Sequence, residues 1–200
     1  MKKLILLIIF CNIAFFANAQ SNTQDEGVII NGVKWATRNV DMPGTFADTP
    51  ESPGMFYQWN NKKAWSTTDS VDTGWNYKVS KGKEWKKTND PSPTGWRVPT
   101  VDEIRKLLDK EKVENEWITT ENGVTGRKFT DKATGNTLFL PAVGGRYGSY
   151  LRRSISGKYW SSTPCKLGTL GMCDFGFDED GVYRHSFNRS YGLSVRSIAE

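Results

Sequence analysis

The chain has 200 residues and a formal charge of +5, and its 37% hydrophobic content includes eight Trp, seven Tyr and ten Phe. Two of the positive charges, Lys2 and Lys3, lie at the N-terminus, and the remaining excess is small and scattered, which argues against a nucleic-acid partner. A chain of this length is expected to form one domain with a core that a small number of bulky rings fills.

Residues 1–19 have the pattern of a secretory signal peptide. Lys2 and Lys3 precede an apolar run at 4–16, and Ala17-Asn18-Ala19 offers a small-x-small cleavage site. A retained membrane anchor is the alternative, but the run is short for a hydrocarbon core about 30 Å thick. We therefore expect an exported chain, in the periplasm, at the cell surface or secreted, that does not span the membrane after cleavage.

Behind the signal peptide, residues 20–27 are a polar, flexible lead-in and residues 28–200 are predicted to form a single domain. The domain opens with a β-hairpin, because 28–30 and 33–35 flank Asn31-Gly32, a pair that tolerates positive φ. A loop follows, and the apolar run at 55–59 is predicted to be a buried strand.

Residues 60–93 show no periodic pattern and contain Trp65, Trp75 and Trp85 among polar residues. An irregular segment of this length inside a compact domain is often functional. The interpretation we favour is that the three indoles pin the segment to the body as a packed cover, with Trp65 or Trp75 at the rim of a ligand site.

One helix is predicted, at about residues 100–112. Thr100 and Glu103 have the spacing of a capping box, in which each side chain satisfies a backbone donor at the start of the helix. Val101, Ile104, Leu107 and Leu108 then fall on one face that packs on the core.

From residue 126 onward the pattern predicts β structure to the end of the chain. Phe175 and Phe177 alternate with acidic residues, which is typical of a strand with one buried and one wet face. The strands are expected at 126–130, 137–140, 157–162, 170–177, 182–187 and 192–198.

No catalytic residue, metal site or cofactor is predicted. His185 is the only histidine, no Gly-x-Ser-x-Gly elbow accompanies it, and an exposed position is its default interpretation. Residues 178–181 (DEDG) could offer oxygen ligands to Ca²⁺, but they lack the alternation of an EF-hand loop, so a solvated hairpin turn is favoured. Cys165 and Cys173 remain after cleavage, and a disulfide and two separate thiols both stay open.

The last third of the chain carries exposed-type aromatic and guanidinium residues between strand-like runs. Tyr supplies rigid contact area and Arg supplies a planar fork for polar groups, so such residues are typical of recognition surfaces. The predicted ligand-binding residues are Tyr147, Tyr150, Arg152, Arg153, His185, Asn188, Arg189 and Tyr191.

Six motifs follow one another along the chain: 32–40 (GVKWATRNV), 54–60 (GMFYQWN), 93–100 (PTGWRVPT) with Glu103, 138–146 (LFLPAVGGR), 159–163 (YWSST) and 192–196 (GLSVR). Together they resemble the Fibrobacter succinogenes major paralogous domain, a family of exported bacterial proteins. The resemblance covers nearly the whole mature chain.

The resemblance implies an α+β, C-type-lectin-like fold of the kind shared with formylglycine-generating enzymes, with short twisted antiparallel sheets, few helices and much ordered loop. The closing motif is also similar to the end of variable domains that retroelements diversify, where the last third forms the ligand face. The chain departs from true C-type lectins, because it lacks their Glu-Pro-Asn, Gln-Pro-Asp and Trp-Asn-Asp motifs. Cys165 and Cys173 are also further apart than the copper-binding cysteines of the formylglycine-generating enzymes, so we expect neither calcium-dependent lectin activity nor oxidase activity.

The sequence therefore predicts an exported, non-enzymatic binding or adhesion domain whose partner is an extracellular glycan or a surface protein. Two alternatives remain. One is an enzyme that acts on extracellular polysaccharide or on a protein thiol, and the other is a structural subunit of a surface assembly.

Overall fold

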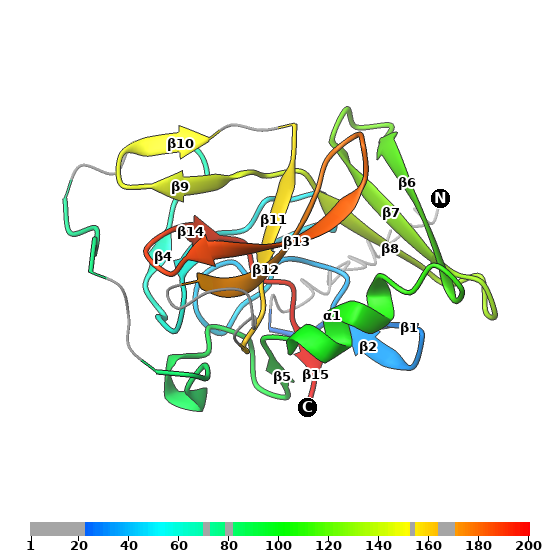
Figure 1. Ribbon diagram of the computed structural model, residues 1–200, viewed down its shortest axis with the longest axis horizontal. Helices are drawn as coiled ribbons and strands as arrows, with labels where there is room; N and C mark the ends of the chain where they lie inside the picture. Colours follow the sequence, from blue (N-terminus) through cyan, green and yellow to red (C-terminus); the bar gives the residue numbers. More distant parts are fainter. Residues whose placement is uncertain (1–22, 70–72, 79–81, 153–154, 164–170) are drawn as a thin grey trace, which may run out of the picture.

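The computed structural model describes residues 23–69, 73–78, 82–152, 155–163 and 171–200. The predicted signal peptide, Arg153 and Cys165 lie outside these ranges. The described part consists of small antiparallel sheets, one α-helix and long connecting segments (Figure 1), which confirms the α+β class.

No helix in the described ranges combines the length and the apolar character that crossing a bilayer requires.

The first sheet joins the two ends of the described chain. The predicted hairpin is confirmed: Asn31 has φ 46° and Gly32 has φ 74°, as a turn with two left-handed residues requires. Its second strand pairs with the last strand of the chain through Trp35 and Ile198. The order of strands is β1 (Val28–Ile30), β2 (Val33–Trp35), β15 (Ile198–Ala199) and β5 (Trp96–Arg97).

The second sheet is built around β14 (Gly192–Leu193), which pairs with β3 (Phe56–Gln58) on one side and with β9 (Gly145–Tyr147) on the other. The predicted buried strand at 55–59 is thus confirmed as β3. The sheet ends with β10 (Tyr150–Arg152) at one edge and β4 (Ala64–Trp65) at the other.

Two three-stranded sheets complete the described part. In Figure 1 the β6–β8 sheet and the β9–β10 hairpin lie at opposite ends of the molecule. One sheet has the order β11 (Gly157–Trp160), β12 (Gly171–Phe177) and β13 (Val182–Asn188), and the other has the order β6 (Val113–Thr119), β7 (Thr125–Asp131) and β8 (Thr137–Pro141).

The helix α1 (Val101–Leu107) begins where the capping box predicts, but the prediction that it extends to about residue 112 is wrong. The Thr100 side chain accepts from the Glu103 amide, and the Glu103 carboxylate accepts from the Thr100 amide at 2.7 Å. After Leu107 the chain turns, because the amides of Lys112 and Val113 both donate to the Asp109 carbonyl and lead directly into β6. A short 3-10 helix, η1 (Lys87–Asn89), also precedes β5.

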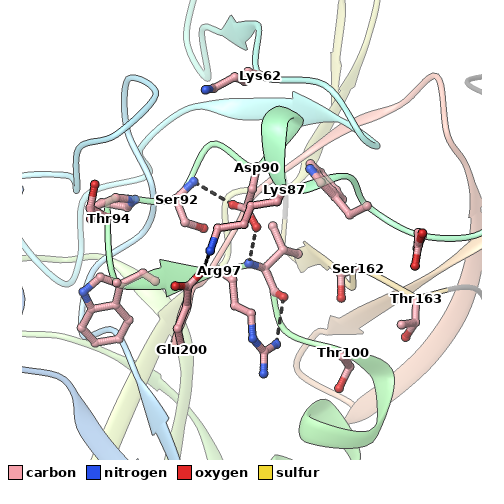
Figure 2. Close-up of a pocket in the computed structure, with 16 residues that line it drawn as sticks. Lys62, Lys87, Asp90, Ser92, Thr94, Arg97, Thr100, Ser162, Thr163 and Glu200 are labelled. Atoms are coloured by element: carbon pink, nitrogen blue, oxygen red, sulfur yellow. Dashed lines mark hydrogen bonds and ion pairs between the residues drawn. The ribbon is translucent and has the colours of Figure 1, made fainter.

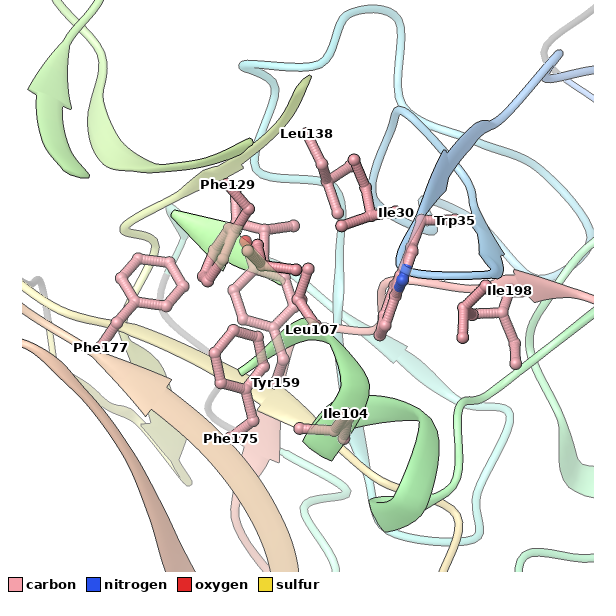
Figure 3. Packing of buried hydrophobic residues seen from close by; sticks show 13 residues of the cluster. Ile30, Trp35, Ile104, Leu107, Phe129, Leu138, Tyr159, Phe175, Phe177 and Ile198 are labelled. Carbon is pink, nitrogen blue, oxygen red and sulfur yellow. The ribbon is translucent and has the colours of Figure 1, made fainter. Parts of the chain in front are cut away.

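The main core lies between the helix and three of the sheets (Figure 3). Ile104 and Leu107 of α1 are buried in the same cluster as Tyr159, Phe175 and Phe177. The rings of Tyr159 and Phe177 are nearly parallel, with 5.9 Å between their centroids. The predicted alternation along β12 therefore has its aromatic face on the core.

The indoles of the 60–93 segment are all buried in the protein. Trp65 and Trp75 pack against each other with 4.8 Å between ring centroids, and Trp85 meets the edge of Trp59 at 5.7 Å. The interpretation of this segment as a cover pinned by its indoles is confirmed.

A fully buried guanidinium connects the two ends of the fold. Arg196 is 1% exposed, and it donates to Asn39 Oδ1 at 3.0 Å and to the Ala36 carbonyl at 3.2 Å. Burial lowers the pKa of Arg196 to about 10, while the nearby Tyr159 and Asp25 oppose that shift, so the side chain is a cation at neutral pH.

Replacing this cation should be strongly destabilising. We expect Arg196→Leu to lower the free energy of unfolding by about 3 kcal/mol or more, because Asn39 and the Ala36 carbonyl lose their buried donors. Urea denaturation would measure this loss. The control is Arg105→Ala on the exposed side of α1, which should change the value by no more than about 0.5 kcal/mol. Equal effects of the two substitutions would contradict the assigned role.

The capping box should make part of the stability acid-sensitive. Burial alone would raise the pKa of Glu103, but hydrogen bonds from Arg97 and Thr100 outweigh it and hold the pKa below the ordinary value of 4.5. A carboxyl whose pKa is depressed by folding stabilises the fold above its unfolded pKa, and this contribution disappears as the pH falls.

We therefore expect the stability difference between the wild-type chain and Glu103→Gln to shrink as the pH is lowered from about 7 to about 3. Urea titrations at several pH values would measure it. A difference that stays constant over this range would show that the charge of Glu103 is not what stabilises the helix start.

Candidate functional site

Two hollows in the described surface are candidates for a ligand site. The larger, of about 520 Å³, lies between η1, β5, the start of α1 and the C-terminal residue (Figure 2). Several of its charged groups have partners within the chain: Lys87 Nζ lies 2.8 Å from Glu200 Oε1, and the Asp90 carboxylate accepts from the backbone amides of Ser92 and Val98 at 2.9 Å. Those groups are already partnered inside the chain, so this hollow shows no clear preference for a ligand.

The second hollow, of about 340 Å³, lies where the β9–β10 hairpin approaches β11, β13 and β14. It falls within the size range of small-ligand sites in proteins. The described residues that line it are Gly145, Arg146, Tyr147, Tyr150, Arg152, Lys158, Phe187, Tyr191 and Leu193.

One wall of this hollow is a continuous row of aromatic rings. Tyr147 and Tyr191 lie 4.8 Å apart between centroids with a tilt of 33°, and Phe187 meets the edge of Tyr191 at 5.1 Å. Tyr77 extends the row, because its ring lies edge-on to Tyr147 at 5.5 Å. We call Tyr77, Tyr147, Tyr191 and Phe187 the aromatic row.

Glycine permits the tight geometry of the hairpin beside the row. Gly148 has φ +61° at the first position of the two-residue turn between β9 and β10, a conformation that favours glycine. A Cβ on Gly148 would also lie 2.4 Å from the Tyr77 hydroxyl oxygen. The turn thus brings Tyr77 and Tyr147 together.

Arg146, which is 1% exposed, anchors the β9–β10 hairpin. Its guanidinium donates to the carbonyls of Ser66 and Gly148, at 2.9 and 3.3 Å, and also to the carbonyl of Asp69. Burial lowers the pKa of Arg146, and the negative charge of Asp69 opposes this shift. Arg146 therefore joins the hairpin to the 66–69 segment, from the face of β9 opposite to Tyr147.

A second cation comes from β11. Lys158 is 8% exposed, and its Nζ lies 4.2 Å from the centroid of Phe187 and 6.0 Å from that of Tyr183. Such a position over ring faces is favourable for an ammonium group.

The β10 strand forms the outer rim of the hollow, and its Tyr150 and Arg152 side chains are exposed to solvent. Tyr150 is 68% exposed, although it is a large aromatic residue. Arg152 is exposed too, and its guanidinium forms no hydrogen bond or ion pair with another residue of the described ranges. The rim therefore presents one ring and one planar cation to an incoming ligand.

Four of the predicted ligand-binding residues meet in this hollow: Tyr147, Tyr150, Arg152 and Tyr191. Arg153 and the side chain of His185 lie outside the described part of the structure. The other two are not among the lining residues. Asn188 Oδ1 accepts from the amide and hydroxyl of Ser190, and Arg189 lies 4.6 Å over the Trp59 ring and donates to the Gly82 carbonyl at 2.7 Å.

The prediction that Trp65 or Trp75 lies at the rim of the ligand site is wrong. They are only 5% and 8% exposed, and they pack with Phe56 in a cluster of their own. The physical reason is that the interior position lets two large apolar rings pack on each other and on β3.

Four lining residues with side chains were not predicted: Arg146, Lys158, Phe187 and Leu193. They come from separate strands that only the tertiary fold brings together. Side chains alternate between the two faces of a strand, so Lys158 lies on the same face of β11 as Trp160. This spacing is the one sequence pattern that could have placed Lys158 beside aromatic residues.

Residues 178–181 form the hairpin turn between β12 and β13, as predicted. The Asp178 carboxylate accepts from the amides of Asp180 and Gly181, at 3.1 and 3.2 Å. Within the described ranges, no group of three or more His, Cys, Asp or Glu side chains could hold a metal ion. A disulfide and two separate thiols both stay open for Cys165 and Cys173, because Cys165 lies outside those ranges.

Comparisons of the chain with protein-family models, with curated proteins and with solved structures find no significant match.

Truncation of Tyr150 at the rim and of Tyr191 in the aromatic wall should change the free energy of unfolding by different amounts. We expect Tyr150→Ala to change the free energy of unfolding by no more than about 0.5 kcal/mol, because the ring is exposed. Tyr191→Ala should cost about 2 kcal/mol or more, because Tyr147 and Phe187 lose a packing partner. Urea denaturation of both variants would measure this, and a similar loss in both would show that the rim is also part of the packed frame.

Proposed function

We propose that this chain is an exported, non-enzymatic ligand-binding domain of the C-type-lectin-like kind, and that its ligand is held in the hollow beside the aromatic row. The proposal includes membership of the Fibrobacter succinogenes major paralogous domain family, to which its motifs point. The observation that supports it most is the meeting of Tyr147, Tyr150, Arg152 and Tyr191 in one hollow.

The chemistry of the lining residues favours binding over catalysis. The described residues that line the hollow supply rings and cations, and none of them carries a carboxylate, imidazole or thiol. Aromatic surface with a few polar groups is typical of sites that orient a ligand. An enzyme acting on polysaccharide would need a pair of carboxyl groups at its cleavage site.

The size of the hollow favours a glycan over a surface protein as the ligand. A stable protein interface buries about 800 Å² per partner, whereas a hollow of about 340 Å³ suits one or two small rings. The faces of Tyr147 and Tyr191 offer flat apolar surface against which the C–H groups of a sugar ring can pack.

The test is a glycan array probed with the chain from Gln20 onward, with and without a calcium chelator. We expect specific binding that survives chelation and that Tyr150→Ala reduces about tenfold, since loss of one stacking ring removes about 1–1.5 kcal/mol. The control is Met42→Ala, which removes a half-exposed apolar side chain from the loop between β2 and β3.

Three results would contradict the proposal: binding abolished by the chelator, binding unaffected by Tyr150→Ala, or no binding to any glycan or surface protein. Turnover of a bound polysaccharide would instead favour the enzymatic alternative. An obligate oligomer without ligand binding would favour a structural subunit.

A further inference from the structure

We propose that the ligand of the hollow is an acidic sugar, a pyranose ring that carries a carboxylate, as in uronic-acid polysaccharides. This inference rests on the proposed function, because it assigns the ligand class of the same site. It requires two features together: a flat apolar wall for the ring and a positive environment for the carboxylate.

The charge of the lining residues supplies the positive environment for the carboxylate. The side chains of Arg152 and Lys158 supply two cations to the lining, and none of the other described lining residues is acidic. Arg146 also lines the hollow, but its side chain lies on the opposite face of β9 from Tyr147, and its guanidinium is bound by the carbonyls of Ser66, Gly148 and Asp69. Asp69 reduces the local positive charge through its interaction with Arg146, but it does not itself line the hollow. A negative group is therefore favoured there, and a cationic ligand is opposed by the like charges of Arg152 and Lys158.

Among these cations, Arg152 is the one placed to bind the carboxylate directly. Arg146 is committed to three backbone carbonyls, and Lys158 lies against the ring of Phe187. Arg152 is exposed at the rim and its guanidinium has no partner among the described residues. A guanidinium can donate two parallel hydrogen bonds to a carboxylate, which fixes both the distance and the orientation of the sugar.

The aromatic row supplies the flat apolar wall for the sugar ring. Tyr147 and Tyr191 form a surface in which two rings lie 4.8 Å apart, and Phe187 continues it toward Lys158. A sugar ring packed on this surface would have Arg152 and Tyr150 at its edge, because both residues belong to the adjacent hairpin strand. The same hollow can therefore hold the ring and its carboxylate at once.

The experiment compares acidic oligosaccharides with neutral forms of the same sugars. Oligomers of galacturonate, alginate, hyaluronate and heparosan would each be titrated calorimetrically against the chain from Gln20 onward, beside the carboxyl-reduced form of each. We expect at least one acidic oligomer to bind about tenfold more tightly than its reduced form, as a charge-assisted hydrogen bond allows. The preference should weaken as the salt concentration rises.

Two variants separate the role of Arg152 from a general effect of charge. Arg152→Gln should remove most of the preference for the acidic form and leave the weak binding of the reduced form unchanged. Arg105→Gln removes one positive charge on the exposed side of α1, away from the hollow, and should keep the preference. Both positions are solvent-accessible, so both variants should fold.

Equal binding of acidic and reduced forms, lost in Tyr150→Ala, would overturn the acidic-sugar inference and leave the proposed function standing. A preference that persists in Arg152→Gln would overturn the role of that residue. An acidic, tyrosine-containing peptide would be titrated in parallel, and binding to this peptide alone would overturn the sugar assignment while keeping a binding domain. The absence of binding to every oligosaccharide and to the peptide would overturn the acidic-sugar inference, and the glycan array would then decide the proposed function separately.

Discussion

The rest of the structure depends on the burial of one charged side chain between the two ends of the chain. Arg196 is joined to Asn39 and to the Ala36 carbonyl, and on either side of it the amides of Ala36 and Val40 donate to the carbonyls of Ser197 and Val195. An ion so deeply desolvated is stable only if all these partners are in place. The GVKWATRNV and GLSVR motifs therefore form one hydrogen-bonded unit, and neither motif would hold its geometry without the other.

This arrangement positions the candidate site through the strand that precedes Arg196. The β14 strand pairs with β3 and β9, and a Cβ on Gly192 would lie only 2.9 Å from the Trp75 ring. The sheet that presents the hollow is thus held by non-local contacts at its centre, while its outermost hairpin carries Tyr150 and Arg152 into solvent. On β10 the exposed Tyr150 and Arg152 alternate with Leu151, which packs against the cluster of Phe56, Trp65 and Trp75.

Local rules predicted the elements whose geometry is decided by neighbouring residues. The Asn31-Gly32 turn and the Thr100–Glu103 cap were found because each satisfies its own backbone within a few residues. The helix length was missed because the turn at Asp109 is set by its connection to β6. Half of the predicted ligand-binding residues line one hollow, whereas Lys158 and Phe187, which were not predicted, reach it from distant strands. Whether an arginine faces water, like Arg152, or lies on a ring, like Arg189 on Trp59, depends on contacts that no periodicity encodes.

The bonds of Arg146 to three carbonyls have a consequence for how such a chain can change over evolutionary time. They hold the β9–β10 backbone and the 66–69 segment together without using the side chains at the rim. Substitutions at Tyr150 and Arg152 are then nearly free of folding constraints, so mutation can alter the exposed surface of the hairpin while the fold persists. Under the proposed function, such a surface would acquire new specificities by single steps, each of which leaves a folded protein for selection to act on.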